Sequence, residues 1–476
     1  MRATKRATGR LLHWTFPVAT ALILALAIPA SSGAAQQRPG GSLSQLRAEK
    51  GCLIDRSTPK PGCKKVRALK TPGPFMGSRA IAISPSGKHL YVASSASNAI
   101  AIFRRDRKSG QLSQPTGEAG CVAARGNFGC DEAWGVSGPN SLALSPDGRF
   151  LYATSRNAST VTVYRRNSET GALRQLAGSR GCVSGSGLPG CAAVTALDGP
   201  DVAVVSPDGR NLYVGSFLGS ALVVLQRDRQ NGTLSQASDG TGCLVEVPAE
   251  GCTTALGLGN PEGLAISADG SSVFAATPGS NAVLAFSRNP TDGSLTQVEG
   301  GFGCISSSEI EGCTAGRETS GANAVEVAPD DSAVYATSLI SDSVTSFGRS
   351  LEFGGLYQLS GALGCSVWLG AEDCYPARGM RSPEGIAFSP DGLNAYVSAF
   401  GTGGLAVLNR NPATGAVIQK RAPWGCVASS STAGCSRGRA LAGAGAVAVS
   451  ANGRFVYATA ARANAITVFK RRPNGR

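Results

Sequence analysis

The sequence predicts an all-β fold, a seven-bladed β-propeller in which every blade is a four-stranded antiparallel sheet. Three observations support this prediction: a unit of 61 residues occurs seven times, each unit contains four short strand patterns, and the two ends of the chain complete each other. Units that repeat at a fixed period bury their apolar faces against their neighbours. The turns that open the units mark the register, at Ser84, Ser145, Ser206, Ser267, Ala328, Ser389 and Ser450.

One unit illustrates the four predicted strands. Alternating apolar and β-branched residues predict strands at 141–144, 150–154, 161–164 and 172–176. A Ser-Pro-Asp-Gly turn at 145–148 separates the first two strands, residues 155–159 join the second to the third, and a Thr-Gly turn at 170–171 precedes the fourth. Four antiparallel strands repeated around a ring are typical of a propeller blade.

The two ends of the chain predict that the ring closes. The last unit stops after its third strand, at residues 466–469, and therefore lacks a fourth strand. Residues 41–45 match residues 110–114, which form the fourth strand of another unit. We therefore expect the N-terminal strand to complete blade 7, which would remove the open sheet edges of the array.

The first 35 residues differ from the repeats. They have a basic start, an apolar stretch from 17 to 28 and small residues at the end, which together indicate an export signal. No later run approaches the roughly 20 apolar residues that a membrane crossing needs. We therefore expect a signal peptide over residues 1–35 and one propeller domain over residues 36–476, secreted, monomeric and without a membrane span. The full chain has a formal charge of +14.

Cysteine follows the repeat as strictly as the turns do, with one pair in each unit. An even number of Cys residues in an exported chain predicts disulfides, and local pairing within each inter-blade loop is the simplest topology. Zinc is the alternative, but a chain without its first 35 residues has one His to offer as a further ligand. The predicted pairs are Cys52–Cys63, Cys121–Cys130, Cys182–Cys191, Cys243–Cys252, Cys304–Cys313, Cys365–Cys374 and Cys426–Cys435.

The second strands carry a motif that resembles a known family. Tyr91-Val92-Ala93-Ser94, and similar segments at 213–216 and 396–399, each follow a Ser-Pro-(Asp/Ser)-Gly turn. They resemble the seven-bladed lactonase-type propellers with YVTN-like repeats, over residues 41–472. That family includes 6-phosphogluconolactonase-like proteins and carboxymuconate cyclases, so the resemblance implies lactone chemistry. The muconate enzymes rely on a His with Glu and Arg, and His89 does not match that His; we interpret His89 as structural.

An Arg follows the third strand of every unit. One interpretation is a basic ring that attracts a polyanion such as an acidic cell-wall polymer or nucleic acid. The other is that each Arg orders its blade by binding turn carbonyls or the turn Asp. Since no aromatic residues are interleaved for base stacking, nucleic acid is disfavoured as a partner. The residues are Arg105, Arg166, Arg227, Arg288, Arg349, Arg410 and Arg471.

The Cys-bound loops differ between units, and variable loops on a rigid frame are where binding usually resides. We expect one acidic and one basic sector on this face. The acidic sector contains Glu246, Glu250, Glu309 and Glu311. The basic sector contains Lys64, Lys65, Arg67, Arg437 and Arg439. The partner expected at this face is a protein, a glycan or a small molecule, although a solvated charge mixture without function fits the same pattern.

The residues that open the innermost strands should line one mouth of the central channel. They form the ring Arg79, Asn140, Asp201, Glu262, Asn323, Glu384 and Gly445, and Glu326 adds a carboxylate nearby. Oxygen ligands that converge on an axis suit Ca²⁺, so Asp201, Glu262 and Glu384 are candidate calcium ligands. This also resembles the calcium-dependent lactonases on six-bladed propellers, an analogy between folds. The alternative is that these side chains cap turns and hydrate the channel.

Two classes of function follow. The first is a secreted binding or scaffold propeller that uses the disulfide-stapled loop face, favoured because no nucleophile, His base or cofactor motif is evident. The second is a lactonase-type hydrolase or cyclase at the channel mouth, with Glu or Asp as base and a metal or Arg79 polarising the lactone carbonyl.

Overall fold

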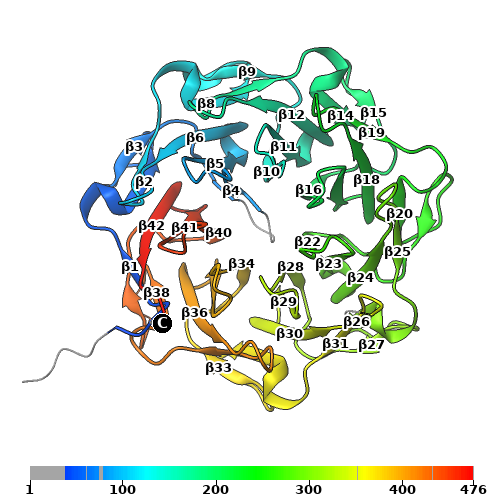
Figure 1. Cartoon of the computed structure of the whole chain (residues 1–476). Coiled ribbons are helices and arrows are strands. Elements are labelled where there is room, and N and C mark those ends of the chain that lie inside the picture. Colours follow the sequence, from blue (N-terminus) through cyan, green and yellow to red (C-terminus); the bar gives the residue numbers. More distant parts are fainter. Residues whose placement is uncertain (1–37, 61, 74–78, 351, 431, 475–476) are drawn as a thin grey trace, which may run out of the picture. The chain divides into compact units, whose positions relative to one another are not determined.

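The computed structural model describes residues 38–60, 62–73, 79–350, 352–430 and 432–474, so the predicted export signal lies outside the described residues. Seven sheets are arranged in a ring (Figure 1), and the predicted all-β seven-bladed propeller is confirmed. Among the described residues, no helix has the length and apolar character needed to cross a bilayer. The helices present there are short 3-10 turns: η1 (Ala48–Gly51), η2 (Ser95–Ser97), η3 (Gly117–Gly120), η4 (Asn127–Gly129), η5 (Arg156–Ala158), η6 (Gly178–Gly181), η7 (Pro278–Ser280), η8 (Gly300–Phe302) and η9 (Gly361–Gly364).

Blade 2 shows the arrangement of the strands. Its innermost strand lines the channel and pairs antiparallel with the second, which pairs antiparallel with the third. Two short strands, β13 and β14, then pair one after the other with the third strand, and β15 runs parallel to β14. The strands are β10 (Pro139–Leu144), β11 (Phe150–Ser155), β12 (Thr160–Arg166), β13 (Leu173–Gln175), β14 (Cys182–Ser184) and β15 (Ala192–Ala193).

Each blade therefore has more strands than the predicted four. The predicted fourth strand corresponds to β13, after which the chain leaves the ladder through η6 and rejoins it as β14. The Cys182–Cys191 disulfide holds the segment before β15 beside the start of β14, so β15 adds to the sheet in parallel. Strands of two or three residues are too short to show an alternation pattern in the sequence.

The other blades repeat this order. Blade 1 contains β4 (Ile81–Ile83), β5 (His89–Ser94), β6 (Ala99–Arg105), β7 (Leu112–Ser113), β8 (Cys121–Ala124) and β9 (Asp131–Ala133). Blade 3 contains β16 (Pro200–Val205), β17 (Asn211–Ser216), β18 (Ala221–Arg227), β19 (Leu234–Gln236), β20 (Cys243–Val245) and β21 (Thr253–Thr254). Blade 4 contains β22 (Gly263–Ile266), β23 (Ser272–Thr277), β24 (Ala282–Arg288), β25 (Leu295–Gln297), β26 (Cys304–Ser306) and β27 (Thr314–Ala315).

The next two blades complete the regular part of the ring. Blade 5 contains β28 (Ala322–Val327), β29 (Ala333–Ser338), β30 (Ser343–Arg349), β31 (Leu356–Gln358), β32 (Cys365–Trp368) and β33 (Tyr375–Ala377). Blade 6 contains β34 (Pro383–Phe388), β35 (Asn394–Ala399), β36 (Gly404–Arg410), β37 (Val417–Gln419), β38 (Cys426–Ala428) and β39 (Ser436–Arg437).

Blade 7 joins the two ends of the described chain and confirms the predicted closure. Its first three strands come from the C-terminal part and its outer strands from the N-terminal part. Leu43 pairs with Arg471 and Gln45 with Phe469, antiparallel, as the fourth-strand segment of any other blade would. The strands are β40 (Ala444–Val449), β41 (Phe455–Ala460), β42 (Ala465–Arg471), β1 (Leu43–Gln45), β2 (Cys52–Asp55) and β3 (Lys64–Val66).

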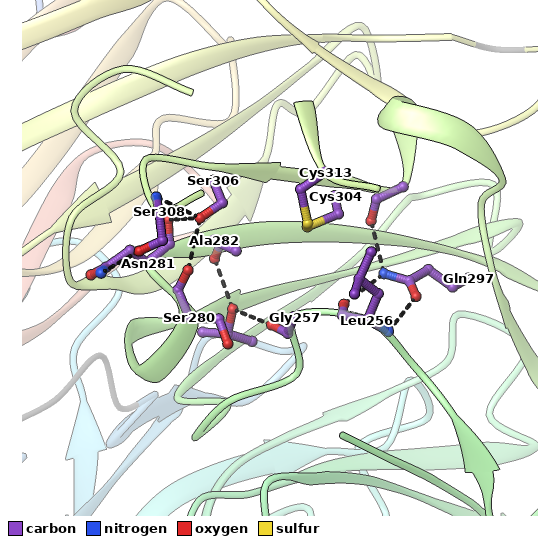
Figure 2. Close-up of a disulfide and its surroundings, with 12 residues drawn as sticks. Leu256, Gly257, Ser280, Asn281, Ala282, Gln297, Cys304, Ser306, Ser308 and Cys313 are labelled. Carbon is purple, nitrogen blue, oxygen red and sulfur yellow. Dashed lines mark hydrogen bonds between the residues drawn. A yellow bond between two sulfur atoms is a disulfide. The ribbon is translucent and has the colours of Figure 1, made fainter. Parts of the chain in front are cut away.

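All seven predicted disulfides are present, one on the outer strands of each blade. Figure 2 shows Cys304–Cys313 with Gln297 beside it. The Gln297 amide donates to the Leu256 carbonyl at 2.9 Å and accepts from the Leu256 N–H at 2.8 Å. These two bonds hold the segment that connects blade 3 to blade 4 against blade 4. Disulfides of this density indicate an oxidising environment, extracellular or periplasmic.

The seven Arg residues after the third strands lie between blades, buried, with exposed fractions of 3–7%. Arg166 is typical: its Nε donates to the Tyr91 hydroxyl of the preceding blade at 2.7 Å, and its Nη1 donates to the Gly148 carbonyl at 2.8 Å. Tyr91 in turn donates to the Gly171 carbonyl at 2.9 Å. We call this set of contacts a blade joint. The structure therefore supports the structural interpretation of the seven Arg residues, and they form no basic surface.

Candidate functional site

The ring residues predicted from the sequence gather at one end of the channel. Each stands at or just before the start of an innermost strand, and the chain then runs along the channel to the Ser-Pro-Asp-Gly turn at the far end. In five blades a register shift interrupts the pairing at this point, for example between Pro200 and Val202. A bulge of this kind changes the direction of a side chain, and Asp201 accordingly has no paired residue on the neighbouring strand. We call the end of the channel where these residues gather the ring end.

Amides and carboxylates of neighbouring blades pair at the ring end. Asn140 donates through its amide to Asp201 of the next blade, and Arg156 contacts the other oxygen of the same carboxylate at 2.7 Å. Asn323 repeats the arrangement, since its amide donates to Glu384 of the next blade at 3.4 Å. The Thr337 hydroxyl donates to the Asn323 carbonyl oxygen at 2.9 Å, which fixes the orientation of that amide.

Glu262 is the exception in this ring. Its side chain is 1% exposed, and its Oε2 atom has no hydrogen-bond partner. Burial raises the pKa of Glu262 to about 9, and the charges of Asp201 and Glu384 add to the effect. Burial also raises the pKa of Asp201, but Arg156 and Asn140 oppose the rise and the pKa is about 6. At neutral pH the ring therefore holds a protonated Glu262 beside an ionised Asp201.

The channel itself forms a cavity of about 460 Å³ below this ring. Among its described lining residues most are Ala, Val, Leu and Ile, and the charged ones are Arg79 and Glu326. These two side chains come from blades 1 and 5 and form an ion pair at 2.6 Å. Burial raises the pKa of Glu326, and Arg79 limits the rise. Both side chains are about one-third exposed, at 36% and 30%, so they remain accessible from the cavity.

The predicted ligand ring thus separates into two groups. Arg79 and Glu326 face the cavity, whereas Asn140, Asp201, Glu262, Asn323 and Glu384 are almost fully buried around its mouth. Gly445 contributes no side chain. Among the described residues, no three His, Cys, Asp or Glu side chains come close enough together to hold a metal ion. Calcium binding by Asp201, Glu262 and Glu384 therefore stays a prediction, and we derive no chemical step through a metal.

Arg156 was missed by the sequence reasoning. It lies on η5, between the second and third strands of blade 2, and its guanidinium stacks over the Phe217 ring at 4.1 Å while it binds Asp201. Comparison of the seven copies of the repeat could have identified Arg156. The seven copies have Ser95, Arg156, Phe217, Pro278, Leu339, Phe400 and Ala461 at this position, so one copy alone is charged.

His89 lies in a blade joint, far from the ring end along its blade. It is 2% exposed, and its Nδ1 atom is 2.9 Å from Nη2 of Arg166. Burial lowers the pKa of His89 to about 4, and the Arg166 charge contributes, so the imidazole is neutral and accepts this bond. In blade 3 the equivalent Asn211 accepts the same bond from Arg288 at 2.7 Å. The structural interpretation of His89 is therefore supported.

Comparison with protein families agrees with this fold. A family model described as the seven-bladed β-propeller lactonases matches residues 65–124, 127–185 and 195–310. Together with the seven blades, this match identifies the chain as a seven-bladed β-propeller of the lactonase type. A comparison with curated protein sequences found no match.

Two solved structures illustrate the range of proteins with similar folds. The hydrazine synthase of Kuenenia stuttgartiensis is 17% identical with a TM-score of 0.51, over 83% of this chain and 96% of that chain. The periplasmic gluconolactonase of Pseudomonas aeruginosa is 19% identical with a TM-score of 0.50, over 79% of this chain and 88% of that chain. At these identities the likeness establishes the fold alone, and the activity has to be argued from the site.

Proposed function

We propose that this protein is a lactonase-type hydrolase whose substrate occupies the channel cavity. The observation that carries the proposal is the Arg79–Glu326 pair, which places a carboxylate and a guanidinium 2.6 Å apart in a largely apolar cavity. A cavity of about 460 Å³ is within the usual range for small-molecule sites. The similarity to the lactonase family favours this activity over the binding or scaffold role.

The reaction uses the two charged groups in complementary roles. The Glu326 carboxylate takes a proton from a water molecule as the water oxygen attacks the lactone carbonyl carbon. Arg79 binds the carbonyl oxygen, which gains negative charge in the transition state. The ring C–O bond then breaks, and protonated Glu326 returns the proton to the departing ring oxygen. The product is an open hydroxy acid, and the Glu326 carboxylate is restored.

The buried ring supports this pair from the mouth of the channel. A protonated Glu262 keeps one negative charge away from the cavity, and Arg156 neutralises Asp201. Burial raises the pKa of Glu326 above its ordinary value, and a raised pKa makes a carboxylate a stronger base. Calcium binding by Asp201, Glu262 and Glu384 stays a separate prediction, which titration calorimetry of Ca²⁺ into chelator-treated protein would test. We also propose that the protein is secreted, with cleavage after the predicted signal.

A panel of γ- and δ-lactones tests the proposed activity, with hydrolysis followed by pH-stat titration above the uncatalysed rate. Glu326→Gln keeps the shape of the side chain and should lower kcat by roughly 100-fold or more. Arg79→Ala should lower kcat/KM by a similar factor. Glu309→Gln, at an exposed position in the Cys304–Cys313 loop, serves as the matched control. No turnover of any lactone by the wild-type protein, or full activity of Glu326→Gln, would overturn the proposal.

A further inference from the structure

The outer strands of blade 7 carry an unusual concentration of positive charge. Residues 38–70 contain nine Lys and Arg residues and two acidic residues. One of the acidic residues, Asp55, is 2% exposed and accepts hydrogen bonds from the Leu69 N–H at 3.0 Å and the Ser57 hydroxyl at 2.6 Å. The Asp55 carboxylate is therefore buried and does not offset the positive charge at the surface. Glu49, on η1, is the one acidic residue of this segment at the surface.

Two grooves flank this blade, and cations line both. The blade 6–7 groove has a volume of about 640 Å³ and is lined by Arg38, Arg47, Arg437 and Arg439. The blade 7–1 groove has a volume of about 380 Å³ and is lined by Arg56, Lys64, Lys65 and Arg67. Among the described lining residues of the two grooves, none is acidic.

Four of the eight groove cations make contacts within the fold. The guanidinium groups of Arg67 and Arg439 bind backbone carbonyls of the blade crossings, for example Gly117 at 2.6 Å and Ala48 at 2.9 Å. The Lys65 ammonium group donates to the Thr58 carbonyl, and Arg38 lies over the Trp424 ring at 5.2 Å. By contrast, Arg47, Arg56, Lys64 and Arg437 are exposed. The ion pairs found within the described residues include no cation of either groove. Their positive charge is therefore presented to solvent.

The equivalent surfaces of other blades differ. The groove beside blade 2 mixes Arg165 and Arg174 with Glu118, Asp131 and Glu169. Residues 295–316, which hold the outer strands of blade 4, contain three Glu residues and no Lys or Arg. A feature that the fold needs appears in every copy of a repeat. The basic grooves occur beside one blade, so stability of the propeller does not explain them.

We infer that the rim of blade 7 is a docking surface for a linear acidic polysaccharide that lies across both grooves. Two basic grooves on either side of one blade suit a polymer with repeated negative charges better than a single small anion. Among the described lining residues of the grooves, none is aromatic, so bases would have no stacking platform and nucleic acid fits less well. The oxidising environment indicated by the disulfides is where such polysaccharides occur, and the inference does not depend on the proposed lactonase activity.

Binding to immobilised heparin and polygalacturonate tests this inference, with dissociation constants measured over a range of salt concentrations. One double variant, Arg47→Glu with Arg437→Glu, reverses two charges in the blade 6–7 groove. A second, Arg56→Glu with Lys64→Glu, does the same in the blade 7–1 groove. The matched control is Arg174→Glu with Arg180→Glu on blade 2, where both residues are exposed. Thermal unfolding of each variant checks that the propeller is intact.

Each groove variant should weaken binding to at least one of the two polysaccharides by roughly tenfold or more and flatten its salt dependence, whereas the control should change the affinity by less than about twofold. Equal weakening by the control would show attraction by net charge alone and overturn the inference. So would the absence of wild-type binding to both polysaccharides at physiological salt. Tighter binding to duplex DNA through the same residues would overturn the assignment of the partner to polysaccharides.

Discussion

Carboxyl groups around the channel differ in protonation although their sequence settings are alike. Asp201, Glu262 and Glu384 occupy the same position in three copies of the repeat. Asp201 has Arg156 and Asn140 as partners, whereas Glu262 has an oxygen with none. Burial without a partner disfavours the charged form of a carboxyl group, which is why the pKa of Glu262 is the higher one, at about 9.

The raised pKa of Glu262 predicts a stability that falls as the pH rises. In the unfolded chain this carboxyl group loses its proton near pH 4.5, but in the folded protein it does so near pH 9. Between these values deprotonation favours the unfolded state, by roughly 1.4 kcal/mol for each pH unit. Glu262→Gln removes the titration, so the variant should gain stability over the wild type as the pH is raised from 5 to 8. Calorimetric Tm values at both pH values check this, and an equal difference at the two would contradict it.

The sequence could predict which residues surround the channel but not how they divide. A ligand site has to break the sevenfold symmetry, and this criterion selected Arg79 and Glu326 together with the buried ring. Which side chains face the cavity depends on bulges and on partners in neighbouring blades, and those are set by tertiary packing. Arg156 also breaks the symmetry, but it lies in a loop whose path to Asp201 cannot be read from spacing.

Blade joints are the elements that connect neighbouring sheets, and one of them is incomplete. In six joints the Arg Nε donates to a Tyr hydroxyl at 2.5–2.7 Å. Between blades 4 and 5 the Tyr is replaced by Phe274, and Nε of Arg349 has no hydrogen-bond partner. A buried charged donor without a partner costs free energy.

Phe274→Tyr should therefore stabilise the protein. The new hydroxyl would accept from Arg349 and donate to the carbonyl of Gly354, the residue that matches Gly293 in the joint of Tyr213. We expect a gain of about 1 kcal/mol in the free energy of unfolding.

The reverse change, Tyr213→Phe, opens an intact joint and should cost about 1–3 kcal/mol, since it leaves Arg288 in the condition of Arg349. Denaturant unfolding of the two variants beside the wild type measures both effects. A loss of stability in Phe274→Tyr with an unchanged Tyr213→Phe would show that the joints contribute nothing.

Element prediction succeeded where patterns are long and failed where they are short. Strands of six or seven residues, such as β11 and β12, show alternation over their whole length. The outer strands β14 and β15 have three and two residues, and their pairing follows from the disulfide between them. Spacing of the Cys residues gave the disulfides correctly, but not the strands that they hold.

At the scale of the whole molecule, β1 and β2 close the ring, because both pair with β42. Leu43, Ser44 and Gln45 pair with β42, and the Tyr396 hydroxyl of blade 6 donates to the Gly41 carbonyl at 2.8 Å. Matching the two chain ends in the sequence was enough to predict this closure. The sequence predicted a basic sector from Lys64, Lys65, Arg67, Arg437 and Arg439, but not its division into two grooves, which are lined by residues from three blades that only the closed ring brings together.

Removal of β1 should weaken the closure of the ring. A chain that begins at Leu46 keeps the pairing of β2 with β42 but loses the pairing of β1, and it exposes part of a sheet edge. We therefore expect the Tm to fall by roughly 5 °C or more and the protein to self-associate. A chain that begins at Arg38 is the control. Calorimetry and sedimentation velocity report the two effects. A monomer with an unchanged Tm would mean that the strand contributes little to closure.

If the protein is exported as proposed, blade 7 also sets an order of events during that export. Cys52 and Cys63 are 11 residues apart, so their thiols can oxidise as soon as that short segment has crossed the membrane. The sheet neighbours of this segment include Thr467, which is translated more than 400 residues later. The earliest part to emerge therefore waits, already cross-linked, for the latest part, and a nascent chain should acquire protease resistance at blade 7 only when translocation is complete.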